Sequence, residues 1–283
     1  MSFLDKLRET QNRNNSRVCV GLDPDPEKLP VCFKTIQDSL LEFGMRIVDA
    51  TAKYACIFKP NQAFWAHVGA EDELAELIHY IYDRFGLPVI LDAKRGDIGN
   101  TARFYAKEAF ERYGADACTI NAYLGTDTLE PWLGSGNDKA IFVLCHTTNP
   151  GAGEFQEQLL EYNRRPLFVE LAKAATDRGL VNSQEHPETA ITVGLVMAAT
   201  FPEQLVALHD VIPDATPLLI PGIGKQKGEL ESTLKNAQRY PFVINSSGAI
   251  IHASRGSDFA AVAAQKAKAL RDQINEALAS LAA

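Results

Sequence analysis

The segment PVILDAKRGDIGNT, residues 88–101, passes from apolar residues to charged ones within a few positions. Val89, Ile90 and Leu91 are typical of a buried β-strand, and the glycines that follow permit a sharp turn. Enzymes built on parallel strands often carry their functional residues where a strand ends. The fold therefore depends on how often this arrangement recurs along the chain.

Eight short runs are apolar and rich in β-branched residues, which predicts eight strands. They span residues 17–22, 54–59, 88–92, 116–121, 140–145, 190–197, 217–220 and 241–245. Stretches with helical spacing lie between them. Alternating strands and helices imply parallel pairing through crossovers, and eight such units in about 250 residues are typical of an α/β fold, the (β/α)8 TIM barrel. We expect a single domain over residues 1–283, with a doubly wound sheet as the competing architecture.

Polar residues at the ends of these runs favour the barrel, because a barrel gathers the carboxyl ends of all its strands in one mouth. The polar or glycine-rich ends are Asp23; Lys59 and Asn61; Asp92, Lys94 and Asp97; Asn121; residues 146–149; Gly222 and Gly224; and residues 245–248. Barrels commonly bind a phosphate at their last two loops, through backbone N–H groups that glycine leaves accessible. We therefore expect a phosphorylated substrate.

The composition excludes several classes of protein. The chain has 28 Lys and Arg against 36 Asp and Glu, and this net charge of −8 argues against a nucleic-acid-binding protein. No apolar run approaches the roughly 18 residues of a membrane span. The N-terminus becomes polar too early for a signal peptide, and the five cysteines include no C-x-x-C pair. We expect a cytoplasmic protein with neither membrane nor nucleic-acid partners.

Residues 150–188 form the longest gap between predicted strands, and we interpret them as an insertion with a helix near residues 166–178. Such a segment could form a lid or an oligomer contact. The Ala-rich stretch 255–283 predicts a closing helix.

The charged residues predict a network at the barrel mouth. Asp92 and Lys94 are two residues apart, so on a strand both project to the same side, and Lys59 and Asp23 come from the two preceding strands. Such a network would keep lysine as a charged ammonium group. Asp97 lies beyond the strand and could point into this site or into that of a neighbouring subunit. The alternative is a salt-bridge cluster at the barrel rim, which the convergence of three strands makes less attractive.

Other catalytic motifs are absent from the sequence: H-E-x-x-H, G-x-S-x-G, a P-loop and a G-x-G-x-x-G that follows a strand. This disfavours metal-site, serine-hydrolase and nucleotide-fold interpretations.

These residues resemble the orotidine 5'-phosphate decarboxylase family, in particular its longer type 2 branch. The D-x-K-x-x-D run of Asp92, Lys94 and Asp97 is shared with metal-dependent phosphosugar enzymes. More specific is the ordered set of segments VGLD (20–23), FKPNQAF (58–64), Asn121 with YLG (123–125), TTNPG (147–151) and PGIG (221–224). The resemblance covers nearly the whole chain.

The resemblance implies a homodimer that converts orotidine 5'-monophosphate to uridine 5'-monophosphate and carbon dioxide in de novo pyrimidine biosynthesis, with no metal or organic cofactor. Lys94 would stabilise and protonate the C6 carbanion, and Asp92 would lie near the departing carboxylate. Asp97 would complete the array from the partner subunit, and Thr101 would also cross the interface. Lys59 and Asp23 would order the network and contact the ribose.

The resemblance also implies the other substrate-binding residues. Thr148 stands where a serine usually contacts the pyrimidine edge, and Gln226 corresponds to the side chain that bridges phosphate and base. The remaining expected contacts are Asn61, Asn121, Gly222, Gly224, Ser247 and Gly248.

Gly248 departs from the family pattern, in which the eighth strand ends in Ser-Ser-Arg and the arginine binds the phosphate. Loss of such a charge-assisted contact predicts weaker phosphate affinity with the reaction retained. Arg255 or Lys227 could compensate.

Three other functions stay open from the sequence. A Schiff-base aldolase would use Lys59 or Lys94 as nucleophile, but the flanking carboxylates oppose the low lysine pKa that this chemistry needs. A magnesium-dependent phosphosugar decarboxylase is closer, and chelator sensitivity would identify it. A barrel that only binds a nucleotide is the non-enzymatic alternative.

Overall fold

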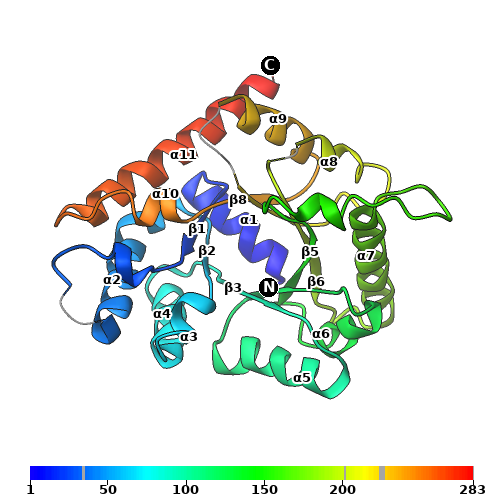
Figure 1. Cartoon of the computed structure of the whole chain (residues 1–283), viewed down its shortest axis with the longest axis horizontal. Helices are drawn as coiled ribbons and strands as arrows, with labels where there is room; N and C mark the ends of the chain where they lie inside the picture. The colour runs from blue at the N-terminus through cyan, green and yellow to red at the C-terminus, as the bar shows by residue number, and fades with distance from the viewer. Residues whose placement is uncertain (34–35, 201, 223–226, 283) are drawn as a thin grey trace.

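Eight parallel strands form a barrel in the computed structural model, which describes residues 1–33, 36–200, 202–222 and 227–282 (Figure 1). The strands are β1 Val18–Leu22, β2 Ile57–Pro60, β3 Ile90–Arg95, β4 Ala117–Ile120, β5 Ala140–His146, β6 Thr192–Met197, β7 Leu218–Pro221 and β8 Phe242–Ser246. They pair in the order β2-β1-β8-β7-β6-β5-β4-β3, and two isolated parallel bridges, Phe58 with Val89 and Asn61 with Asp92, connect β2 to β3. The predicted barrel is confirmed, and the doubly wound sheet was the wrong alternative.

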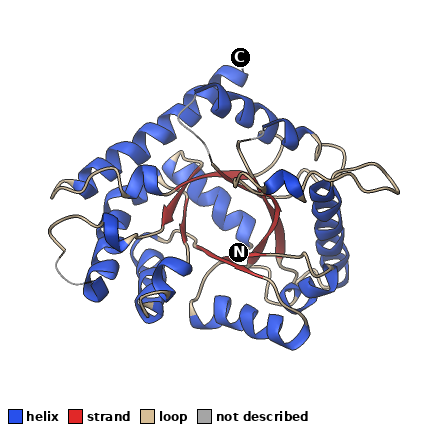
Figure 2. Ribbon diagram, in the orientation of Figure 1, coloured by secondary structure: helices blue, strands red, loops and turns tan. Residues whose placement is uncertain are grey.

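Helices surround the ring of strands (Figure 2). They are α1 Phe3–Asn14, α2 Ile36–Thr51, α3 Ala63–Ala66, α4 Glu71–Phe85, α5 Gly99–Lys107, α6 Glu130–Leu133, α7 Leu167–Glu185, α8 Pro202–Val206, α9 Lys227–Ala237, α10 Gly248–Ile251 and α11 Phe259–Ala282. In α4 the buried side chains recur at helical spacing, which directs one apolar face toward the barrel: Leu74, Leu77, Ile78 and Ile81. No helix in the described ranges is long and apolar enough to cross a membrane.

The strands are buried on both sides, which explains why their sequences are continuously apolar rather than alternating. One cluster of buried side chains fills the barrel interior on the side away from the mouth. It includes Cys19, Ile57, Ile90, Phe142 and Leu219. A larger cluster lies mostly between the strands and the surrounding helices. Packing on both faces holds the strand ends in fixed positions around the mouth.

Helix α1 covers the end of the barrel at which the strands begin. Phe3 packs edge-on against Phe142 with ring centroids 6.0 Å apart. Thr10 Oγ1 donates a hydrogen bond to Cys56 O, and Gln11 Nε2 donates one to Phe242 O, at 2.8 and 2.9 Å. Lys6 reaches Asp116, just before β4, at 3.0 Å. The opposite end, where the strands terminate, is left for the site.

The segment between β5 and β6 begins with a short 3-10 turn, Ala152–Glu154, and an antiparallel bridge between Leu159 and Pro166 precedes α7. Helix α7 begins one residue after the predicted start and continues to Glu185. The predicted C-terminal helix corresponds to α11, which begins at Phe259.

Two strand boundaries differ from prediction by three residues, and the others differ by two or fewer. β2 begins at Ile57 rather than Tyr54, because Ala52–Tyr54 forms a 3-10 turn. β3 continues past Asp92 to Arg95, and its pairing with β4 shifts register between Leu91 and Arg95. Within this irregular stretch Lys94 has a φ of 47°, a conformation uncommon for residues other than glycine.

Candidate active site

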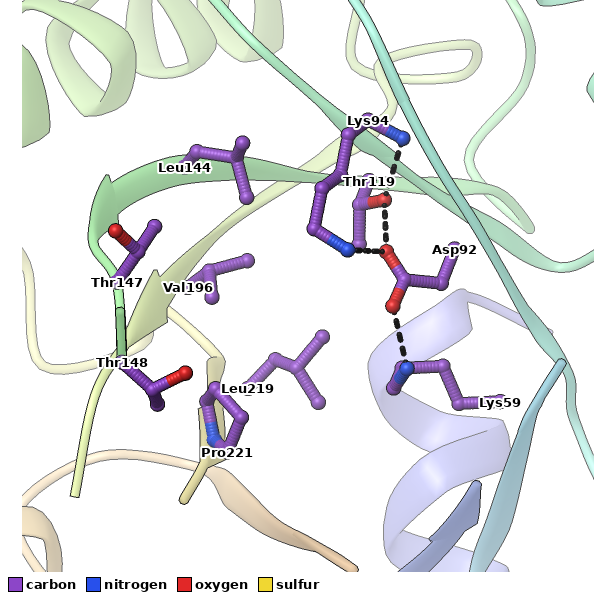
Figure 3. A pocket seen from close by; sticks show the side chains of 10 residues that line it. All are labelled: Lys59, Asp92, Lys94, Thr119, Leu144, Thr147, Thr148, Val196, Leu219 and Pro221. Carbon is purple, nitrogen blue, oxygen red and sulfur yellow. Dashed lines mark hydrogen bonds and ion pairs between the residues drawn. The ribbon is translucent and has the colours of Figure 1, made fainter. Parts of the chain in front are cut away.

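A cavity of about 120 Å³ lies at the carboxyl ends of the strands (Figure 3). It is lined by Lys59, Asp92, Lys94, Thr119, Leu144, Thr147, Thr148, Val196, Leu219 and Pro221. Lysines and the aspartate lie on one side, and Thr147 and Thr148 lie across from Asp92 and Lys59. Six strands, β2 to β7, and the loop after β5 contribute side chains to the lining of this cavity.

Asp92 is held between two ammonium groups. Lys59 Nζ lies 2.5 Å from Asp92 Oδ2, and Lys94 Nζ lies 2.6 Å from Oδ1. The side chains of Lys59 and Asp92 are only 5% and 7% exposed, whereas that of Lys94 is 49% exposed. Lys94 is thus the cation of this network that is most accessible to a ligand.

The pairing determines the charge states. Burial alone would favour neutral forms, but the positive charges of Lys59 and Lys94 outweigh it and hold the pKa of Asp92 far below its usual value. Burial likewise opposes a charged Lys59, yet the carboxylates of Asp92 and Asp23 raise the pKa of Lys59 well above normal. A carboxylate on Asp92 paired with an ammonium group on Lys59 is therefore the stable state at neutral pH.

Thr119 is a member of the network that the sequence interpretation missed. Its Oγ1 donates to Asp92 Oδ1 at 2.8 Å and accepts a hydrogen bond from the backbone N–H of Lys94 at 3.0 Å. The second bond holds the backbone of Lys94 in its left-handed conformation. Thr119 is two residues before Asn121 on the predicted strand, so the period of two could have placed it on the same face.

Asp23 and Asn61 lie on the β1 and β2 side of the mouth. Asp23 Oδ1 is buried and has no hydrogen-bond partner among the described residues. A buried carboxylate oxygen ordinarily has a partner, so this atom is suited to accept a hydrogen bond from a ligand hydroxyl. Asn61 pairs with Asp92 through a backbone bridge, and its Oδ1 accepts a hydrogen bond from Ala63 N at 3.2 Å.

Two glycines allow the loops of the mouth to approach each other closely. A Cβ on Gly222, whose φ is 86°, would lie 2.6 Å from Thr148 Cγ2. A Cβ on Gly21 would lie 1.8 Å from Ser247 Oγ. Gly222 thus brings β7 against Thr148, and Gly21 makes room for Ser247.

Gly248 begins α10 at an exposed position, and a Cβ built on it would meet nothing within 4 Å. Arg255 is exposed, and no contact of its side chain is seen within the described ranges. Gly224 and Gln226 lie outside the described residues, as does the side chain of Lys227.

Of the predicted site residues that the structure describes, only Lys59, Asp92, Lys94 and Thr148 line the cavity of this single chain. Asp97 is partly exposed, and its Oδ1 accepts a hydrogen bond from Ile98 N at 2.8 Å. Thr101 is exposed on α5, and the Oδ1 of the exposed Asn121 accepts from Tyr123 N at 2.9 Å. Across the described ranges, no three His, Cys, Asp or Glu side chains form a group that could hold a metal ion.

Comparison with known proteins identifies the family. A sequence model described as "Orotidine 5'-phosphate decarboxylase / HUMPS family" matches residues 16–265. A protein of Ralstonia nicotianae named orotidine 5'-phosphate decarboxylase is 47% identical over 280 residues, which cover 98% of this chain and 99% of that protein. The chain belongs to the orotidine 5'-phosphate decarboxylase family.

Further members support the same assignment. The orotidine 5'-phosphate decarboxylase of Cupriavidus necator is 46% identical over 279 residues, 97% of this chain and 98% of the relative. The structure of Leishmania donovani OMP decarboxylase superimposes with a TM-score of 0.78 at 35% identity, and the match covers 98% of both chains. The similarity to members of the orotidine 5'-phosphate decarboxylase family thus covers the barrel and its mouth, including the segment between β5 and β6.

Proposed function

We propose that the protein converts orotidine 5'-monophosphate to uridine 5'-monophosphate and carbon dioxide, a step of pyrimidine biosynthesis. The observation that carries this proposal is the Lys59–Asp92–Lys94 array at the mouth of a barrel whose relatives are named for this reaction. Loss of carbon dioxide leaves an electron pair on C6 of the pyrimidine, where no π-system can absorb it. A fixed ammonium group is the kind of charge that stabilises such a carbanion.

Lys94 supplies that charge and the proton. As the bond between C6 and the carboxylate breaks, its electron pair stays on C6 and carbon dioxide leaves. Lys94 Nζ then transfers a proton to C6, and the neutral amine takes a proton from solvent. Asp92 directs Lys94 through their 2.6 Å contact and places negative charge near the departing carboxylate.

The remaining contacts follow the geometry of the mouth. Asp23, through its unpartnered buried oxygen, and Lys59 contact the ribose. Thr148 contacts the pyrimidine edge across the cavity. Ser247 and the backbone N–H groups near Gly222 and Gly248 receive the phosphate. Asn61, Asn121, Gly224 and Gln226 complete the substrate-binding set.

A homodimer accounts for two predicted residues outside the cavity, Asp97 and Thr101. Around Asp97 and Thr101, the α5 region and the loop after β4 expose several large apolar side chains: Ile98, Phe104, Tyr123 and Leu124. Exposed apolar side chains at adjoining positions are typical of a surface that a partner covers. In the proposed dimer, which acts in the cytoplasm, Asp97 and Thr101 enter the partner's site.

The first test follows the ultraviolet absorbance of orotidine 5'-monophosphate with purified enzyme, with and without chelator. We expect chelator-resistant formation of uridine 5'-monophosphate that Lys94→Ala abolishes. Lys266→Ala, which removes an exposed lysine of α11, is the matched control and should retain full turnover. No turnover by the unaltered protein would contradict the proposal and favour a binding-only barrel. Turnover lost with chelator and restored by Mg²⁺ would instead indicate a metal-dependent decarboxylase.

A further inference from the structure

The segment that follows β5 folds back onto the end of the strand that it leaves. Its residues 156–158 lie between the rim of the barrel and the beginning of α7. Phe168 N donates a hydrogen bond to Gln156 O, and Leu167 N donates one to Gln158 O, both at 2.9 Å. The start of α7 therefore holds this segment against the rim from the outer side.

Gln156 makes two hydrogen bonds to a single rim residue. Thr147 N donates to Gln156 Oε1 at 2.9 Å, and Gln156 Nε2 donates to Thr147 Oγ1 at 2.8 Å. The Thr147 hydroxyl in turn donates to Asn149 Oδ1 at 2.6 Å. Backbone and side chain of Thr147 are thus both fixed by one amide group.

Glu157 fixes the preceding rim residue. His146 Nε2 lies 2.9 Å from Glu157 Oε1, and Gln204 Nε2 of α8 donates to the same oxygen at 3.3 Å. The buried His146 ring packs edge-on against Phe168 of α7 at 5.2 Å. Two consecutive residues of the segment therefore hold two consecutive residues of the rim.

We infer that Gln156 is a positioning residue for the substrate. Thr147 and Thr148 form the cavity wall opposite Asp92, and Gln156, which does not line the cavity, determines where that wall lies (Figure 3). The kinetic consequence rests on the function proposed above. Because Thr147 and Thr148 lie across the cavity from Asp92 and contact no reacting atom in the proposed reaction, displacement of this wall weakens the binding of substrate and transition state alike, which raises KM and leaves kcat nearly unchanged.

The experiment compares three variants. Gln156→Leu removes both hydrogen bonds to Thr147, whereas Gln156→Glu keeps an acceptor for the Thr147 N–H and loses only the donor to the Thr147 hydroxyl. Gln158→Leu is the matched control, since this exposed glutamine bonds through its backbone. For orotidine 5'-monophosphate we expect Gln156→Leu to raise KM about tenfold with kcat within about twofold. Gln158→Leu should stay within about twofold of the unaltered protein in both constants, and Gln156→Glu, which loses one of the two bonds, should give a KM between those of Gln156→Leu and the unaltered protein.

A second measurement needs no substrate. Amide hydrogen exchange at Thr147 should accelerate about tenfold or more in Gln156→Leu, because its N–H loses its acceptor, and should stay unchanged in Gln158→Leu. Unchanged exchange, or a Gln156→Leu enzyme that matches Gln158→Leu in KM, would overturn the inference while leaving the proposed reaction intact. An unaltered protein without turnover would instead contradict the proposed reaction, and exchange at Thr147 would still decide the role of Gln156.

Discussion

Each carboxylate oxygen of Asp92 forms an ion pair with a lysine, and the resulting charge states restrict which group can donate a proton. Because its pKa is depressed, the stabilisation by the Asp92 carboxylate is present above its ordinary pKa of about 4 and is lost only as the pH falls through the lower folded value. The raised pKa of Lys59 acts in the opposite direction: its contribution is present below about pH 10.4 and is lost as the pH rises through the higher folded value. Asp92 therefore has no proton to give at neutral pH, which in the proposed reaction leaves an ammonium group as the donor to C6.

Sequence spacing predicted this network only in part. Asp92 and Lys94 are near each other in sequence, and Lys59 follows a strand end, so their convergence could be predicted from the barrel alone. The period of two from Asn121 could have placed Thr119 on the same face of its strand, but nothing in the sequence indicated that its hydroxyl would bind Asp92. The role of Gln156 could not be predicted from the sequence for another reason. Its contact with Thr147 depends on the path of an irregular loop, which no sequence periodicity encodes.

Gly248 offers a direct test of phosphate binding. Its Cβ position is open, so Gly248→Arg can be accommodated without displacing a neighbour in the described structure. A charge-assisted hydrogen bond to phosphate contributes about 1.5–3 kcal/mol, so we expect KM for orotidine 5'-monophosphate to fall about tenfold or more. Steady-state kinetics at low and high salt would measure the effect, which should weaken as salt rises.

Gly248→Met serves as the control for this substitution, because it adds a long side chain without charge. An arginine variant with the same KM as the methionine variant would show that a side chain at this position does not reach the phosphate. Arg255 and Lys227 would then be the remaining candidates for the phosphate contact.

At the scale of elements, apolar runs located all eight strands, because a strand covered on both faces has little choice of residue. The boundaries were less predictable. Tyr54 ends the 3-10 turn Ala52–Tyr54 and directly precedes the apolar residues 55–58, so the sequence did not separate turn from strand. The extension of β3 to Arg95 depends on tertiary pairing with β4. The register shift of β3 also places Lys94 in a conformation that its residue type does not suggest.

Helix α1 provides a test of how separate the two ends of the barrel are. Phe3 is fully buried against Phe142, so Phe3→Ala should lower the free energy of unfolding by about 3–5 kcal/mol. Urea denaturation would measure this loss, and Tyr82→Ala, at an exposed aromatic of α4, should cost almost nothing. Because the cavity lies at the other end, KM should be unaffected under conditions where the variant is folded. A large change in KM would indicate that the two ends are coupled.

At the scale of the whole molecule, the proposed dimer requires that each site combine residues of two chains. Lys94→Ala and Asp97→Ala should each be inactive. A heterodimer of the two variants, isolated with two different affinity tags, would contain one site with Lys94 and the partner subunit's Asp97 both intact. We expect it to show about half the activity of the unaltered dimer.

Lys94→Ala subunits carrying both tags are the control for this experiment and should remain inactive. An inactive heterodimer would mean that Asp97 acts within its own chain. Sedimentation analysis of the same preparations would show whether the chains associate at all.

The position of α1 also has a consequence for the order of folding. This helix is synthesised before any strand, but its hydrogen bonds and ion pair reach residues as distant as Asp116 and Phe242. Its full set of contacts therefore cannot form until β8 has left the ribosome, and contacts so remote in sequence form slowly. During that interval Phe3 and Leu7 remain exposed, which makes the nascent chain a substrate for chaperones that bind apolar segments.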